Sequence, residues 1–422
     1  MKIARDLFCK PLVSVFILFV LLAFNLGSNS VARADASYEL RTLYRDTRMK
    51  AMGGAGIALQ LDDRDAVQGI FTNPAQMAGN QDLTLHFFGL DLAASWDTYT
   101  AIGDTMSAFS NFSFSSLNTL MGKNIYANAQ VVSALTLPNF GAALIVDGQY
   151  AFFAKNQAYP EFTVGYQTTT GIQAAWGTSF DLGSVGGGGT SSGRASRSGG
   201  RRRPRTQSGR RAGSAGAQES VPIIGYDGVE GSEIRLGLGG KILWRRGGYK
   251  PLPLTDLLSA DLSTLSRIAG NYETGYGLDA GLQYIRSLGP SMTLSLASSF
   301  MNIGDVDFVG SNSDTLPGNL SAGAALRYSL GGITAATLTY DQSFLFSGVD
   351  DWRKGSHLGV EWELPAISIY GGYNQSYLSY GASFDAWLFR VTATSYAEEL
   401  GARSGQEANR RYLLRLATRI SL

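Results

Sequence analysis

The sequence predicts an all-β fold, a transmembrane antiparallel barrel of about 14 strands. Three observations support this prediction. Extended segments in which apolar and polar side chains alternate recur from residue 83 to the end of the chain. The 422 residues include 52 glycines, 20 tyrosines and 21 phenylalanines but only 16% charged residues, unlike a disordered chain or a helical membrane protein. Beyond the N-terminal region no segment reaches the about 18 uninterrupted apolar residues of a membrane helix, so we expect a membrane crossing made of strands.

Residues 1–34 have the pattern of a secretion signal. Basic residues precede an apolar run over residues 12–26, and an A-x-A cleavage pattern follows at residues 32–34. The run is about 15 residues long, short of the ~20 that a membrane-spanning helix needs. We therefore predict a cleaved signal peptide and localisation in a Gram-negative-type outer membrane. The single cysteine, Cys9, precedes the run, so we expect no disulfide and no thiolate metal site in the mature chain.

The predicted strands number 14, an even number as in bacterial barrels. Most have at least the ~9 to 11 residues that a tilted strand needs to cross a bilayer. Their predicted bounds are 83–96, 125–137, 140–154, 161–181, 233–246, 272–286, 292–304, 319–330, 333–344, 356–364, 367–374, 377–384, 388–397 and 412–422.

The alternation separates a lipid-facing set of side chains from a lumen-facing set. In the predicted strand 356–364, apolar residues occupy the even positions, whereas Glu361 and Glu363 occupy odd ones. In the last strand, Arg415 and Arg419 alternate with apolar residues in the same way. These four residues are predicted to face a polar lumen that tunes passage. A soluble β-sandwich would show the same alternation, but the export signal and the number of strands favour the membrane barrel.

Short and long connections alternate along the chain, as expected for periplasmic turns and external loops. Short ones are predicted at 138–139, 287–291, 331–332, 365–366 and 385–387, and longer ones at 247–271, 305–318, 345–355 and 398–411. The first long loop, 97–124, carries four apolar side chains that we predict to collect a hydrophobic ligand: Phe109, Phe112, Phe114 and Leu117.

Residues 182–232 form a Gly-, Ser- and Arg-rich insert on the predicted periplasmic side. Eight arginines lie between Arg194 and Arg211, and the acidic residues follow them. We expect the insert to be disordered and solvated. The alternative is contact with an anionic partner, such as lipid headgroups or a polymer, because clustered guanidinium groups attract phosphates. We expect no specific nucleic-acid partner.

No catalytic or metal-binding pattern withstands inspection. The G-x-G at residues 54–56 has Leu59 where a dinucleotide fingerprint needs its third glycine. The G-x-S-x-G match at 189–193 lies in low-complexity sequence, where no strand and helix can hold a nucleophile. The two histidines, His86 and His357, are far apart and have no supporting spacing. We therefore expect no enzyme activity, no cofactor and no metal site.

Residues 52–78 form a glycine-rich cap between the signal and the first strand. Three of its glycines can adopt positive φ at little steric cost: Gly53, Gly54 and Gly56. An acidic group interrupts the apolar pattern: Asp62, Asp63 and Asp65. We interpret it as a turn that aids solubility, with a weak cation site as the alternative. A rigid turn is predicted at Asn73, Pro74 and Ala75.

The cap resembles the N-terminal hatch of the FadL-like outer-membrane transporter superfamily, which also includes PorV-type barrels. The motif A-M-G-G-A-G, the acidic turn and N-P-A-Q-M-A directly before the first strand carry this resemblance, and residues 316–323 are similar to a turn and strand start in the superfamily. The resemblance implies a fourteen-stranded barrel over residues 82–422 and a hatch over residues 35–81 that plugs its lumen. Leu422 differs from the aromatic residue usual at the end of such barrels, and the Arg-rich insert is not a feature of the superfamily.

The resemblance implies two alternative functions. The first is passive transport of small hydrophobic compounds, such as fatty acids, across the outer membrane, with membrane lipid and the hydrophobic ligand as partners. The second is a docking or assembly barrel that transports nothing and binds protein or glycan partners. The ligand-binding side chains of the superfamily have no matching positions here, so the sequence assigns no substrate.

Overall fold

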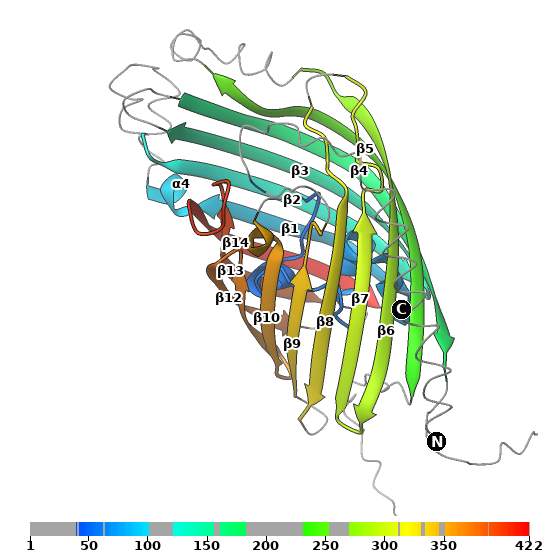
Figure 1. Ribbon diagram of the computed structural model, residues 1–422. Coiled ribbons are helices and arrows are strands. Elements are labelled where there is room, and N and C mark those ends of the chain that lie inside the picture. The colour runs from blue at the N-terminus through cyan, green and yellow to red at the C-terminus, as the bar shows by residue number, and fades with distance from the viewer. Residues whose placement is uncertain are drawn as a thin grey trace, which may run out of the picture.

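The computed structural model describes residues 39, 42–61, 64–100, 121–155, 161–182, 231–252, 270–310, 313–330, 334–345, 351–386 and 388–421. Fourteen antiparallel strands form a closed barrel in which each strand pairs with its neighbours in the sequence and β1 pairs with β14 (Figure 1). The predicted fold class and strand number are therefore confirmed. The predicted signal peptide, the loop residues 101–120 and most of the Arg-rich insert lie outside the described residues.

The observed strands lie close to the predicted segments. They are β1 (Thr84–Ser95), β2 (Asn124–Leu137), β3 (Phe140–Lys155), β4 (Glu161–Asp181), β5 (Ser232–Leu252), β6 (Glu273–Gly289), β7 (Met292–Met301), β8 (Asn319–Ser329), β9 (Ala335–Gln342), β10 (Ser356–Glu363), β11 (Ile367–Asn374), β12 (Tyr377–Ala386), β13 (Phe389–Glu399) and β14 (Ala408–Ser421).

The largest differences from the predicted bounds lie at β5 and β14. β5 continues to Leu252, past the predicted end at residue 246, because the long β4 offers a partner as far as Phe162. β14 begins at Ala408 instead of residue 412, because Ala408 pairs with Glu399 of β13. In both places a paired neighbour extends a strand through residues whose own pattern is typical of a loop.

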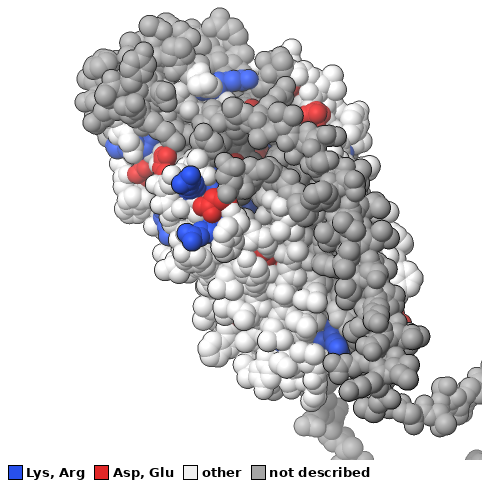
Figure 2. All heavy atoms as spheres, in the orientation of Figure 1, with Lys and Arg blue, Asp and Glu red and all other residues white. Residues whose placement is uncertain are grey.

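The outer surface of the barrel is apolar, whereas the inner surface carries the buried charged and polar side chains of the wall as well as apolar ones. On β6, Leu278 is 65% exposed, whereas the next residue, Asp279, is 1% exposed. On the face drawn in Figure 2, charged side chains gather toward the upper end of the described surface and are sparse over the rest. Near the long-loop end the exposed rings of Trp96 and Tyr412 lie 5.9 Å apart. An apolar belt with aromatic residues at its edge is the surface that a barrel presents to lipid.

The helices are short, and three of them belong to a segment inside the barrel. Residues 42–80, here called the luminal segment, contain α2 (Thr47–Ala51), α3 (Ala66–Thr72) and the 3₁₀-helix η1 (Pro74–Gly79). The other helices in the described part of the chain are α4 (Trp96–Thr100), after β1, and the 3₁₀-helix η2 (Trp352–Gly355), before β10. Within the described part of the chain, no helix combines the length and apolar character needed to span a membrane.

The main apolar core lies between the luminal segment and the inner face of the wall. Ile70 and Met77 of the luminal segment are fully buried and belong to one cluster with Ile145 of β3 and Leu243 of β5. In Figure 1 the luminal segment, in blue, lies inside the barrel, seen behind β9 and β10. The core therefore joins the luminal segment to the wall and would be lost if the segment left the lumen.

Candidate functional site

The luminal segment crosses the barrel and is fixed to the wall at several points. The first is the turn at Gly53 and Gly54, which have φ angles of 69° and 89°. The Gly53 carbonyl oxygen lies 2.9 Å from Nδ1 of His357 on β10. A Cβ added to Gly372 of β11 would lie 2.3 Å from the Gly53 nitrogen, so only a glycine in the wall allows this approach. Gly53 and Gly54 thus use the positive φ angles that glycine can adopt at little steric cost.

Gly56 serves close packing and binding of the backbone to the wall. Unlike Gly53 and Gly54, it has no positive φ angle. Its amide donates a hydrogen bond to Oδ2 of Asp341 on β9, and the amide of Ile57 donates to the same oxygen at 2.9 Å. A Cβ on Gly56 would lie 2.6 Å from Cγ of Met49. The glycine is therefore needed for close packing within the luminal segment, while its backbone binds the wall.

The predicted turn at Asn73, Pro74 and Ala75 is the start of a helix. Asn73 caps η1, because its Oδ1 accepts a hydrogen bond from the amide of Ala75 at 3.1 Å, and Pro74 occupies the first helical position. Nδ2 of Asn73 donates to the Ile57 carbonyl at 3.0 Å, and Nε2 of Gln76 donates to the Leu59 carbonyl at 2.9 Å. Two amide side chains thus fold the luminal segment back on itself.

The wall makes room for η1 with two glycines that the sequence analysis did not identify. A Cβ on Gly237 of β5 would lie 2.2 Å from the nitrogen of Ala75. A Cβ on Gly281 of β6 would lie 2.0 Å from Oδ1 of Asn73. In both strands apolar and polar side chains alternate, and both glycines occupy lumen-facing positions of this alternation. A glycine at such a position is the only sequence signal that could have indicated a close approach of another backbone.

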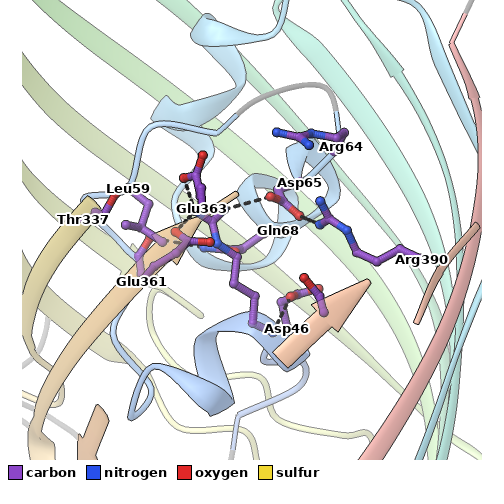
Figure 3. A network of polar contacts seen from close by, with 12 residues as sticks. Asp46, Leu59, Arg64, Asp65, Gln68, Thr337, Glu361, Glu363 and Arg390 are labelled. Atoms are coloured by element: carbon purple, nitrogen blue, oxygen red, sulfur yellow. Dashed lines mark hydrogen bonds and ion pairs between the residues drawn. The ribbon is translucent and has the colours of Figure 1, made fainter. Parts of the chain in front are cut away.

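A network of ion pairs anchors the luminal segment near the short-connection end of the barrel (Figure 3). Asp65 is central to it: its Oδ2 accepts from Arg48 of α2 at 2.8 Å, and its Oδ1 binds Arg390 of β13. Arg48 also binds Glu361. We call this set the luminal ion network; its members are Arg48, Asp65, Arg327, Glu361, Glu363 and Arg390.

Two opposing effects set the pKa of Asp65. Burial alone would raise the pKa of its carboxyl group. The guanidinium groups of Arg390, Arg48 and Arg64 outweigh burial and hold the pKa of Asp65 well below its usual range. Asp65 therefore stays ionised at any physiological pH. The sequence predicts that the acidic turn aids solubility, but Asp65 anchors the luminal segment to the wall. Asp62 and Asp63 lie outside the described residues.

The four residues predicted to face the lumen all contact charged partners. Glu361 binds Arg48 of the luminal segment, and Glu363 binds Arg327 of β8. Arg415 lies 3.0 Å from Oδ2 of Asp46, which precedes α2, and 3.3 Å from Asp91 of β1. Arg419 binds Asp385 at the end of β12 at 3.0 Å. Glu361, Glu363 and Arg415 lie within 4 Å of charged side chains of the luminal segment, whereas Arg419 is linked to it through Asp385, which lies 3.8 Å from Arg64.

The remaining site predictions fall outside the described residues or concern absences. Phe109, Phe112, Phe114 and Leu117, the predicted ligand-collecting residues, lie in the part of the loop that is not described. Among the described residues, no group of three or more His, Cys, Asp or Glu side chains is placed to hold a metal ion.

A cavity of about 60 Å³, here called the inner cavity, separates part of the luminal segment from the wall. Leu43, Tyr44, Met49, Ile57 and Phe71 line one side of it, and Gln173, Lys241, Ser299 and Asn302 line the other. Asn302 directly follows β7, Asn319 begins β8 and Ser343 directly follows β9, and all three line the cavity at the same end of the barrel. The inner cavity therefore lies toward the long loops, whereas the luminal ion network lies toward the short connections.

Comparisons with known proteins give structural likenesses only. No protein-family model and no curated protein matches the sequence. The solved structures to which the chain is similar include the CymD monoaromatic hydrocarbon channel (11% identity, 92% of this chain and 99% of that chain, TM-score 0.43), the toluene transporter TodX of Pseudomonas putida (12%, 91% and 99%, 0.41) and the toluene transporter TbuX of Ralstonia pickettii (10%, 88% and 97%, 0.40). These likenesses concern the fold alone, and the chain's own strand order establishes the barrel.

Proposed function

We propose that the chain forms an outer-membrane channel for small hydrophobic compounds, with the predicted hatch, residues 35–81, as its closing element. The observation that supports this most strongly is the position of the inner cavity. It lies between the luminal segment and the wall, toward the long loops, and one of its sides is apolar. A compound that enters from the long-loop end reaches this cavity and then meets the luminal segment, which must move before the compound can leave at the other end.

The backbone hydrogen bonds between the luminal segment and the wall are compatible with such a movement. Wall side chains bind its backbone: Nε2 of Gln283 donates to the carbonyls of Ala58 and Leu59 at 3.2 and 3.1 Å, and the carboxylate of Asp341 accepts from Gly56 and Ile57. Water can replace each of these partners in an open lumen. The strand ladder is separate from these contacts and stays intact, as it must, because an open strand edge in lipid would leave backbone groups without hydrogen bonds.

The test is uptake of a labelled hydrophobic compound by cells with and without this protein. We expect faster uptake of toluene when the protein is present in the outer membrane. Equal uptake in both cells would contradict the channel and favour the docking barrel instead. The expectation that the cargo includes fatty acids stays a prediction, and the same assay with a labelled fatty acid examines it.

A further inference from the structure

We infer that Arg246, on the outer face of β5, binds the phosphate group of a glycolipid in the external leaflet of the membrane. This site is separate from the luminal segment and does not depend on the proposed channel function. Three observations support it: the position of Arg246 at the edge of the apolar belt, the two aromatic rings beside its guanidinium group, and the hydrogen-bond donors that this group leaves unused.

Arg246 belongs to the outward-facing side chains of β5. The even positions Leu238 and Trp244 of this strand are exposed, whereas the odd positions Lys241 and Arg245 are buried. Arg246 is the next even position after Trp244 and is partly exposed. The pairing of β5 with β6 ends at Arg245, so Arg246 lies at the level where β6 begins, next to the long loops. A cation therefore stands at the external edge of the surface that faces lipid.

Two tyrosine rings from neighbouring strands flank the guanidinium group of Arg246. Its Cζ lies 5.7 Å from the ring centroid of Tyr166 on β4 and 5.0 Å from that of Tyr272, the residue before β6. Nη2 of Arg246 also donates a hydrogen bond to the hydroxyl oxygen of Tyr166 at 3.1 Å. These contacts hold a long side chain in one place, so less conformational entropy is lost when a ligand binds.

The guanidinium group keeps donors for a ligand. It has five N–H groups, and the hydrogen bond to Tyr166 and the two ring contacts are the only interactions that it makes among the described residues. Nε is enclosed by protein and has no hydrogen-bond partner, whereas Nη1, which has none either, is not enclosed. Nη1 is therefore open to a ligand that approaches from the lipid side, and the positive charge has no carboxylate partner in the described part of the chain.

A phosphate group matches the charge and the shape of this cation. A planar guanidinium group binds phosphate through paired hydrogen bonds, which are stronger than those between neutral groups. A phosphate monoester carries about −1.5 to −2 charges at neutral pH. The headgroup of a zwitterionic phospholipid, in contrast, brings its own cation. The site therefore favours a lipid with a phosphate monoester.

The wall next to Arg246 supplies apolar surface for the acyl chains of such a lipid. The exposed apolar and aromatic side chains that follow toward the short connections are Ile242 and Trp244 on β5 and Tyr276 and Leu278 on β6. A free phosphate ion would contact the guanidinium group alone, whereas a phosphorylated glycolipid contacts both parts. We therefore assign the site to lipid A, a glycolipid with phosphate monoesters and acyl chains.

The experiment is native mass spectrometry of the purified full chain in an uncharged detergent. The probes are lipid A, the same glycolipid after removal of its phosphates, and inorganic phosphate. We expect lipid A to bind about tenfold more tightly than the dephosphorylated glycolipid, the effect of one good hydrogen-bonded charge pair. Inorganic phosphate at the same concentration should not displace it. Equal binding of the two glycolipids, no binding of lipid A, or its displacement by inorganic phosphate would overturn the inference.

Variants locate the site on the barrel. Arg246→Gln should abolish the tenfold preference for lipid A, while Arg353→Gln, which removes an equal charge at an exposed residue of η2, should preserve it. Tyr272→Leu keeps the charge and removes one flanking ring, so it should lower the preference roughly threefold. It provides a second test if Arg246→Gln does not fold. A preference unchanged by Tyr272→Leu, or lowered equally by Arg246→Gln and Arg353→Gln, would contradict the assignment to this site.

Discussion

At the scale of single residues, Asp65 shows how a charge in an apparent loop becomes an anchor. Its carboxylate lies between Arg48, in the same luminal segment, and Arg390, which is 325 positions further along the chain. The three side chains are between 5% and 12% exposed. Breaking a buried pair leaves an uncompensated charge behind, so each member depends on the others.

Asp65→Asn should loosen the luminal segment by about 3 kcal/mol, because it leaves Arg48 and Arg390 without their shared carboxylate. Hydrogen–deuterium exchange of the amides of residues 64–80 in the folded barrel measures this. Asp307→Asn serves as a matched control, because Asp307 binds Thr315 at an exposed site in a long loop. Equal protection of the luminal segment in Asp65→Asn and the unaltered chain would show that the luminal ion network does not anchor it.

The depressed pKa of Asp65 also predicts a dependence on pH. Its stabilising effect is fully present above the pKa of an unfolded aspartate, about 3.9, and is lost as the pH falls toward the lower pKa of the folded state. The contribution of Asp65 to the protection of the luminal segment should therefore be constant from neutral pH to about pH 5 and decrease below about pH 4. The Asp65→Asn variant lacks this titrating carboxyl group, so this part of the acid-induced loss of protection should be absent from the variant. A loss of protection between pH 7 and 5 in the unaltered chain that Asp65→Asn abolishes would contradict the assignment.

At the scale of elements, the pair α3 and η1 is held by side-chain amides more than by its own helical hydrogen bonds. Asn73 caps η1 and also reaches the Ile57 carbonyl, and Gln76 binds the carbonyls of Gly56, Ile57 and Leu59. Helices of 7 and 6 residues have little stability of their own. Their position therefore depends on these amides and on the wall behind them.

Asn73→Ala should destabilise the luminal segment by about 2 kcal/mol, since it removes the cap and the bond to Ile57 together. Pro74→Ala should cost only about 0.5 kcal/mol, because proline at this position contributes mainly by restricting the unfolded chain. Hydrogen–deuterium exchange of the amides of η1, measured in both variants, compares the two effects directly. If the two effects were equal, or reversed in order, Asn73 would not be the residue that organises this turn.

Gly237→Ala should push η1 away from the wall, because the new Cβ would lie 2.2 Å from the backbone nitrogen of Ala75. Gly371→Ala on β11 is the matched control, since a Cβ there meets no atom within 4 Å. We expect protease cleavage within the luminal segment to accelerate in the first variant alone. Similar cleavage in both would mean that the glycine is not needed for docking.

At the scale of the whole molecule, the wall was predictable and its contacts with the luminal segment were not. Strand alternation is a local property, so the pattern around Glu361 and Arg415 predicts which side chains face inward. The partner of a lumen-facing charge depends on how a distant segment folds back. No local pattern pairs Asp65 with Arg390 or places Gly237 under η1. Likewise, Gly56 shares its sequence context with Gly53 and Gly54 yet serves packing instead of a turn.

We propose that the luminal segment closes the barrel and moves without disrupting the wall, and the reactivity of a buried thiol measures this movement most directly. Since Cys9 lies in the predicted signal peptide, Met77→Cys provides a single thiol that is fully buried between η1 and the wall. Val309→Cys, at a residue 78% exposed, gives the rate of an open site.

We predict that a thiol reagent labels Met77→Cys at least about tenfold more slowly than Val309→Cys, and that adding Asp65→Asn accelerates labelling at residue 77 while the barrel stays folded. Labelling of Met77→Cys as fast as that of Val309→Cys, or a rate unchanged by Asp65→Asn, would contradict a lumen closed by a segment that the luminal ion network holds in place.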